Sequence, residues 1–149
     1  MLIDANPIRA MSKELRFVTN DLAVQEQLPR GLHFWLSRPD ITGSKNLVCV
    51  RVEVEPGNGH AFHRHPKMEE FIYVISGQAE QWIEDECRVL GPGELAFIPK
   101  DVVHATYNTG TEKLVFLAVL SPAAEPGDTE PDMVDVSTEE PWRSLKAPL

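Results

Sequence analysis

Apolar and polar residues alternate with a period of two along much of the chain. The alternation is clearest over residues 48–54, where valine occupies every second position from Val48 to Val54 and the intervening residues are cysteine, arginine and glutamate. Successive side chains of a β-strand point to opposite faces, so this segment is predicted to be a strand that covers a core on one side only.

Short segments rich in β-branched and aromatic residues occupy most of the remaining chain. They lie at residues 15–19, 31–37, 69–77, 79–85, 94–99, 102–108 and 113–121, and most of them end at a turn-forming residue. Turn signals at intervals of roughly 8 to 12 residues, with no long helical period between them, are typical of an all-β sandwich or barrel. The chain is therefore predicted to be all-β, with its first two segments extending one of two antiparallel sheets and helping to form a homodimer.

The composition changes after Ser121 to a stretch rich in proline and acidic residues, which indicates an extended surface linker. Ser137 and Glu140 have the spacing of a helix capping box, and Trp142 and Leu145 supply an apolar patch. A short terminal helix or turn docked by Trp142 is predicted, with a frayed tail as the alternative. Three parts follow: an N-terminal extension (1–44), a barrel (45–121), and a linker with a docked tail (122–149).

Composition and charge narrow the possible partners. The 149 residues are 42% hydrophobic, as in an ordinary single domain, and no apolar run approaches the roughly 18 residues that a membrane span needs. The N-terminal residues lack the apolar stretch of a secretory signal, so a cytoplasmic location is expected. A net charge of −9, with 14 scattered lysines and arginines, argues against nucleic acid. Cys49 and Cys87 are expected to be buried free thiols.

One polar stretch precedes a predicted buried strand and is rich in histidine. His63 and His65 are two residues apart, so on a strand both side chains would lie on the same face, and Glu70 could return beside them on the next strand. His104 lies on a later segment among apolar residues. Three imidazoles and one carboxylate from three β segments could ligate a divalent transition metal. Glu69 is the alternative carboxylate, although it would face away from the interior.

The spacing of these residues forms two motifs. In the first, Gly57 is followed by five residues, His63-x-His65, four residues, Glu70, six residues and Gly77. In the second, Gly93 is followed by five residues and Pro99, and His104 is followed by three residues and Asn108. Over residues 48–121 the chain therefore resembles the cupin superfamily, and in particular its small single-domain members.

The resemblance implies a double-stranded β-helix, or jelly-roll barrel, with His63, His65, Glu70 and His104 as metal ligands. Asn108 is then a turn residue, and the glycines and Pro99 shape turns. Asp101 departs from the family pattern, which often has glycine there, but aspartate tolerates turn conformations. Four protein ligands would leave two positions open on an octahedral ion, which favours Fe, Mn or Ni, with Zn or Cu also compatible.

The pocket walls supply two candidates for catalysis. With Glu70 pointing inward, Ile72 and Val74 are expected to do so as well, and Gln81 would line the interior and orient a bound water or substrate. A slip of one residue would instead place Trp82 inside. His60 is a rim residue suited to substrate contact or proton transfer.

Aromatic side chains elsewhere are expected to pack rather than to bind substrate. Phe62, Phe71, Tyr73 and Phe97 are assigned to the core or to an interface. Thr106 and Tyr107, which follow His104, are expected to point to opposite faces.

Two function classes remain compatible with these observations. The first is a metal-dependent enzyme, such as an oxygenase or isomerase, acting on a small oxygenated or carbonyl-bearing substrate. The second is a non-catalytic, metal-dependent module that binds or senses a small molecule. A fold of this kind supports many activities, so the fold alone does not decide between them.

Overall fold

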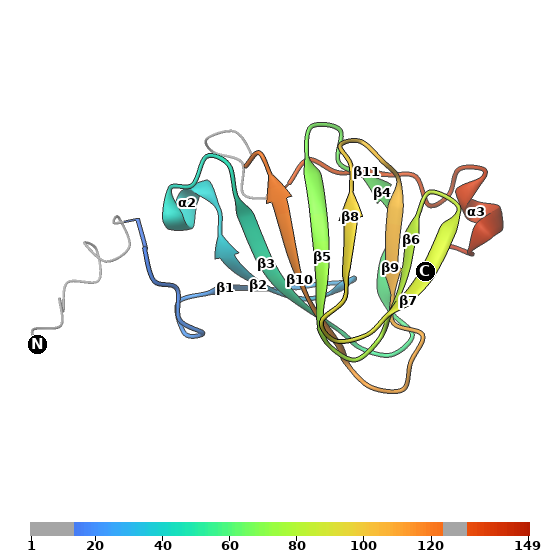
Figure 1. Cartoon of the computed structure of the whole chain (residues 1–149), viewed down its shortest axis with the longest axis horizontal. Coiled ribbons are helices and arrows are strands. Elements are labelled where there is room, and N and C mark those ends of the chain that lie inside the picture. The colour runs from blue at the N-terminus through green and yellow to red at the C-terminus, as the bar shows by residue number, and fades with distance from the viewer. Residues whose placement is uncertain (1–13, 124–130) are drawn as a thin grey trace, which may run out of the picture.

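The computed structural model describes residues 14–123 and 131–149. Two antiparallel β-sheets face each other, and the chain crosses repeatedly from one to the other (Figure 1). The six-stranded sheet has the order β1-β2-β3-β10-β5-β8, and the five-stranded sheet has the order β11-β4-β9-β6-β7. This arrangement is the predicted all-β, double-stranded β-helix fold.

The elements have the following bounds. They are β1 (Val24–Leu28), β2 (Gly31–Ser37), α2 (Pro39–Thr42), β3 (Val48–Val54), β4 (Gly59–Arg64), β5 (Glu69–Ser76), β6 (Ala79–Ile83), β7 (Glu86–Leu90), β8 (Leu95–Ile98), β9 (His104–Tyr107), β10 (Leu114–Ser121), β11 (Val134–Asp135) and α3 (Trp142–Leu145).

The main core lies between the sheets and is built from the alternating positions of their strands. All four valines of β3 are buried, and β10 pairs with β3 so that Phe116 lies opposite Val52. Ile72 and Val74 of β5 are buried in the same cluster, as predicted. Burying each such side chain contributes on the order of 1.5–3 kcal/mol, so this apolar wall fixes the relative position of the strands.

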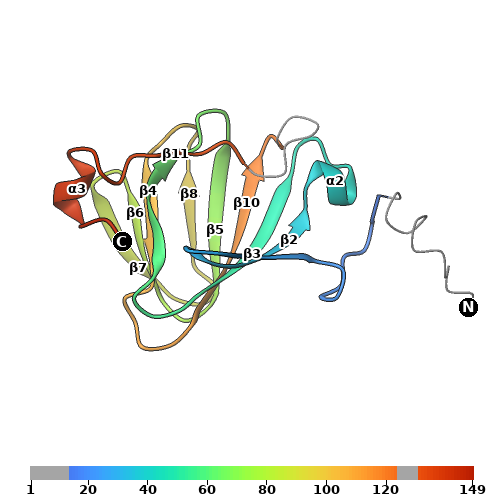
Figure 2. The same ribbon diagram turned by 180° about the vertical axis from the view of Figure 1, so that it is seen from behind.

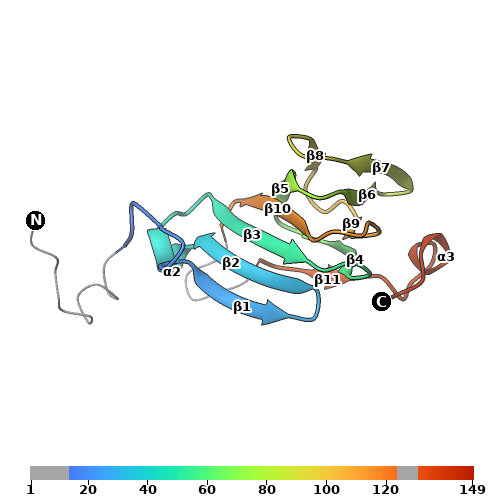
Figure 3. The same cartoon turned by 90° about the horizontal axis from the view of Figure 1, so that it is seen from below.

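The predicted strand at residues 15–19 is wrong. This segment has no strand, although Leu15 donates its amide hydrogen to Ile41 and packs with Val18 against the core. Among the described residues the first strand is β1, which pairs with β2 at the edge of the six-stranded sheet (Figure 3). An edge strand that is exposed on one face and only half-buried on the other needs no apolar alternation, so the polar sequence VQEQL gave no strand signal.

The N-terminal extension and the barrel share a sheet, because β2 is hydrogen-bonded to β3. The boundaries at residues 44/45 and 121/122 stay predictions. Residues 1–13 of the extension and 124–130 of the predicted linker lie outside the described residues.

The predicted docked C-terminal helix is present as α3, at the end of the molecule formed by β6 and β7 (Figure 2). The ring of Trp142 packs 5.3 Å from that of Phe62. The predicted capping box is wrong, because the Ser137 hydroxyl donates to Asp135, while Glu140 accepts hydrogen bonds from Arg143 and Ser144. Local side-chain partners therefore replaced the expected reciprocal cap.

Both cysteines are free, as expected, but only partly buried. Burial raises the pKa of the Cys49 and Cys87 thiols. Among the described residues, no helix has the length and apolar character of a membrane span.

Candidate metal centre

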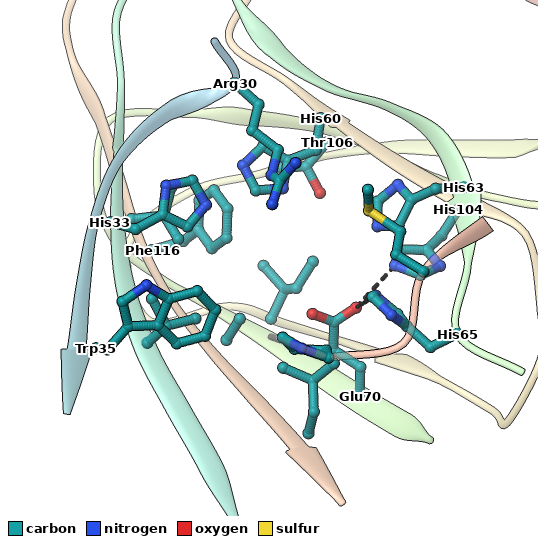
Figure 4. A pocket seen from close by; sticks show the side chains of 17 residues that line it. Arg30, His33, Trp35, His60, His63, His65, Glu70, His104, Thr106 and Phe116 are labelled. Carbon is teal, nitrogen blue, oxygen red and sulfur yellow. Dashed lines mark ion pairs between the residues drawn. The ribbon is translucent and has the colours of Figure 1, made fainter. Parts of the chain in front are cut away.

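Four buried side chains converge between the two sheets. His63 on β4 lies directly opposite His104 on the neighbouring strand β9, His65 follows the end of β4, and Glu70 comes from β5 in the other sheet. One nitrogen or oxygen atom from each residue lies within 4.8 Å of the corresponding atoms of the other three. Figure 4 shows all four at one end of a cavity. The structure thus brings together the four ligand residues that the cupin resemblance implies.

Local strand geometry aims these residues inward. His63 and His65 are buried, whereas Arg64 points the other way and pairs with Asp101 at 2.7 Å. Asp101 has a φ of +64°, the left-handed conformation in which the family often has glycine, and its amide donates to the carbonyl of His65. The turn at Asp101 therefore holds the backbone that carries His65.

The carboxylate in the cluster is Glu70. Glu69 is exposed on the opposite face of β5, so the alternative ligand assignment fails on strand alternation.

Backbone carbonyls fix the orientation of the three imidazoles. Each Nδ1 lies next to a carbonyl oxygen: His63 at 2.7 Å from Ala61, His65 at 2.6 Å from Asp132 and His104 at 2.9 Å from Val102. A carbonyl only accepts, so each Nδ1 carries the hydrogen and each Nε2 presents a lone pair. This tautomer leaves each Nε2 free to bind a metal ion.

Two of the inward-facing atoms have no well-oriented hydrogen-bond partner among the described residues. His104 Nε2 lies 2.7 Å and His65 Nε2 3.6 Å from Glu70 Oε1. Among the described residues, both His104 Nε2 and Glu70 Oε1 are buried without a well-oriented hydrogen bond. Buried polar atoms that share a focal point and have no partner are stabilised by a cation placed among them. Three nitrogens and one carboxylate oxygen are a donor set that first-row divalent ions accept.

The electrostatics of the cluster differ between its histidines. Burial disfavours the imidazolium form of His104, but the adjacent Glu70 carboxylate outweighs burial and raises the pKa of His104. For His63, burial and the neighbouring imidazoles lower the pKa well below its ordinary value. Glu70 therefore favours the imidazolium form of His104, whereas the surroundings of His63 favour its neutral form.

A cavity extends from the cluster between the sheets. The space between its atoms is about 560 Å³, including the part open to solvent. Its walls are largely apolar and include Val50, Val52, Ile72, Phe116, Ala118 and Leu120. A small molecule could therefore reach the four side chains from one side, which a closed structural metal site would not allow.

Gln81 is 3% exposed and points inward, whereas Trp82 packs against the Phe62 and Tyr107 cluster on the other face of β6. Gln81 does not reach the cavity wall, however. Its amide oxygen accepts a 2.6 Å hydrogen bond from the hydroxyl of Thr106, and Thr106 lines the cavity. Gln81 can therefore act on a bound molecule only through Thr106.

His60 borders the cavity. Its Nε2 is buried and has no hydrogen-bond partner among the described residues, and its ring stacks on that of His33 at 5.3 Å. Burial lowers the pKa of both His33 and His60, and the charge of Arg30 lowers each further. Both rings are therefore neutral near pH 7.

Among the cavity residues that sequence reasoning missed are Arg30, His33 and Trp35. His33 and Trp35 share the inward face of β2, but the other face carries Leu32, Phe34 and Leu36, so alternation of apolar and polar residues did not single out the inward face. Arg30 lies in the turn between β1 and β2, where no periodicity could have pointed to it.

The remaining predicted positions divide between core, turn and surface. Phe62 and Tyr107 are buried, and Thr106 faces the cavity on the opposite side of β9. Asn108 is a turn residue, since its side-chain nitrogen donates to the carbonyls of Val54 and Glu112. Tyr73 and Phe97 are exposed on the outer face of the six-stranded sheet and are not core residues.

Comparison with known proteins decides the family. Residues 50–120 match the Cupin domain family. Protein SchB of Streptomyces halstedii is 39% identical over 105 residues, covering 70% of this chain and 73% of SchB. The chain belongs to the cupin superfamily.

Two other relatives are named for a function. Polyketide synthase CurC of Streptomyces cyaneus is 34% identical over 100 residues, covering 67% of this cupin and 60% of CurC. Oxalate decarboxylase OxdC of Bacillus subtilis is 33% identical over 81 residues, covering 51% of this cupin but only 21% of OxdC. A structure of that decarboxylase, described for its Mn(II) centres, superposes with a TM-score of 0.62 at 24% identity, covering 76% of this cupin and 30% of that chain. That likeness shows a shared fold.

Proposed function

We propose that this cupin is a metal-dependent enzyme, an oxygenase, isomerase or related catalyst, that acts on a small oxygenated or carbonyl-bearing substrate. The observation that carries the proposal is the convergence of His63, His65, Glu70 and His104 at one end of a cavity open to a small molecule. One divalent Fe, Mn, Ni or Zn ion per chain would be held by these four residues.

The ion would supply Lewis acidity toward a substrate carbonyl or enol oxygen, or a position for dioxygen. The chain itself would orient the substrate and limit water. The apolar walls of β3, β5 and β10 would disfavour water beside a bound substrate. The Thr106 hydroxyl, held by Gln81, offers its oxygen as a hydrogen-bond acceptor at the cavity wall. His60 offers a neutral, unpartnered Nε2 that could exchange a proton with the substrate.

The relatives support this substrate class. OxdC is named for the decarboxylation of oxalate, a small oxygenated acid, and a structure of that protein is described for Mn(II) centres. CurC is named as a polyketide synthase. Because the chain spans only part of both proteins, their activities serve here to select substrates for testing.

The deciding experiment is anaerobic reconstitution with Fe(II), Mn(II) or Ni(II), followed by a screen of diketones, catechols, keto acids and sugars. Oxygen uptake and product analysis are the two readouts. Turnover that depends on the added ion and disappears in the His104→Ala variant supports the enzyme. If instead a small molecule binds tightly and is recovered unchanged with every ion, the enzyme proposal fails. The protein would then be a non-catalytic binding module.

We also propose that the protein is a cytoplasmic homodimer. Support for the dimer comes from the outer face of β5 and β8, where Phe71 lies opposite Phe97 and Tyr73 opposite Leu95. Tyr73, Leu95 and Phe97 are 39%, 51% and 52% exposed. An exposed apolar face of this kind is typical of an interface, and a second copy would present the same surface to it.

A further inference from the structure

Arg30 places a cationic group in the cavity away from the proposed metal ligands. It lies in the turn between β1 and β2, is half-buried and lines the cavity. Figure 4 shows its side chain directed into the cavity, on the side opposite Glu70. Within residues 14–123 and 131–149, no ion pair or side-chain hydrogen bond involves its guanidinium. A half-buried guanidinium beside apolar walls is stabilised by an anion that accepts its hydrogen bonds.

The imidazoles next to Arg30 extend this polar end of the cavity. His60 and His33 stack with their rings 5.3 Å apart and 11° from parallel. His33 Nδ1 is occupied by the carbonyl of Gly31, whereas His60 Nε2 has no partner among the described residues. Arg30 is therefore the permanent charge at this end, and His60 supplies a polar atom that a bound molecule could engage.

The metal cluster and the polar end at Arg30 and His60 are close enough for one small molecule to contact both. The ring of His60 is 6.3 Å from that of His63 in the metal cluster. Apolar side chains, including Trp35, Ile72 and Phe116, line the cavity between the ends. A ligand with one oxygen group at the cluster would bring its other end beside Arg30 and His60.

Charge balance points to the nature of that second group. Glu70 is the only carboxylate among the described residues that line the cavity. A divalent ion with Glu70 as its single anionic ligand keeps one positive charge, and Arg30 adds another. A ligand carrying two negative charges would neutralise both, whereas a neutral ligand would leave the guanidinium without a partner.

We propose that Arg30 forms an anion subsite together with His60, whose ring stacks on that of His33, and that the substrate is a small organic acid with a metal-binding oxygen group at one end and a carboxylate at the other. This inference rests on the proposed metal-dependent function, which it narrows to dianionic or keto-acid substrates. Because the whole chain carries a net charge of −9, the affinity for such an acid must come from these local positive charges.

The test uses isothermal titration calorimetry on Mn(II)-loaded full-length protein with succinate and glutarate, each compared with its monomethyl ester. The ester keeps one carboxylate for the metal and removes the second charge. The variants are Arg30→Gln and, as a matched control, Arg88→Gln, since Arg88 is exposed on β7 outside this cavity. Metal content and thermal unfolding of each variant are measured alongside.

The wild-type protein is expected to bind at least one diacid ten-fold or more tighter than its ester. Arg30→Gln should remove that preference while keeping its metal, its melting temperature and its affinity for the ester, and Arg88→Gln should bind as the wild type does. Equal affinities for diacid and ester, no diacid binding, or an unchanged preference in Arg30→Gln would overturn the subsite. Failure of the proposed metal site can be distinguished from failure of the anion subsite, because the wild-type protein would then take up no Mn(II).

Discussion

His104 Nε2 lies 2.7 Å from Glu70 Oε1, although the two residues come from opposite sheets of the barrel. Neither atom has a well-oriented hydrogen bond among the described residues. The contact joins β9 and β5 at the point where His63 and His65 also face inward, so a cation there would tie the two sheets together.

The first prediction concerns metal content. Purified protein should carry about one first-row divalent ion per chain, and His63→Ala, His65→Ala and His104→Ala should each lose most of it. Removing a residue that only hydrogen-bonds to a metal ligand typically lowers metal affinity about 10–100-fold, and removing the ligand itself costs more. Mass spectrometry of the metal after dialysis is the measurement. His60→Ala is the control and should keep its ion. Full occupancy in His104→Ala would refute the ligand set.

The second prediction concerns pH and metal affinity. The imidazoles must be neutral to bind the ion, and Glu70 raises the pKa of His104 above its ordinary value. Protons therefore compete with the metal at His104 from above pH 6.5 downward, and affinity should fall steadily as the solution is acidified through that range. Competition titrations with a chelator at several pH values measure this fall. A constant affinity between pH 7.5 and 5.5 would contradict histidine ligation.

The third prediction concerns the stability of the metal-free protein. Burial lowers the pKa of His33 and His60, so below about pH 6.5 the unfolded chain binds protons that the folded chain does not. The contribution of these histidines to the free energy of unfolding is therefore fully present above that pH. It decreases on acidification, by at most about 1.4 kcal/mol per pH unit for each histidine. Urea unfolding of wild type and His33→Gln at pH 7 and pH 5.5 tests this. The free energy of unfolding should differ less between the two pH values in the variant than in the wild type. An equal difference in both proteins would contradict the explanation.

The fourth prediction concerns Gln81. Removing its side chain in Gln81→Ala leaves the buried Thr106 hydroxyl without its acceptor, at a cost of about 1–3 kcal/mol. We expect the variant to keep its metal but to lose turnover about ten-fold or more, mainly in kcat, because Thr106 is no longer held at the cavity wall. Gln78→Ala, at an exposed turn position, is the control. An unchanged kcat in Gln81→Ala would make the residue purely structural.

The fifth prediction concerns assembly. Light scattering at micromolar concentration should give a dimer, and Phe97→Glu should give a monomer with unchanged metal content, because a charge at the outer apolar face opposes its burial. Val89→Glu is the matched control, since Val89 is exposed on β7 in the other sheet. A monomeric wild-type protein would contradict the dimer. A dimeric Phe97→Glu variant would show that the interface does not include this face.

Much of the barrel could be predicted from the sequence because strand alternation is local. The valines of β3 and the inward positions of β5 follow from the period of two, and the same period separates Glu70 from Glu69 and turns Arg64 away from His63 and His65. The spacing of the two motifs then implied which four side chains meet. Asp101 fits the motif because its backbone adopts the left-handed turn that the pattern requires.

The tertiary structure decided the features that depend on neighbours in space. Residues 15–19 have a strand-like composition but no hydrogen-bonded strand partner, whereas polar β1 forms a strand because β2 pairs with it. Gln81 bonds to Thr106 and does not itself line the cavity, and the outer face carrying Phe97 is exposed. Arg30 lies in a turn, where the sequence has no periodic pattern of apolar residues. Its place opposite Glu70 therefore depends on where the β1-β2 hairpin lies relative to the cavity. Side-chain direction along a strand is set by the backbone, but the meeting of distant segments is set by packing.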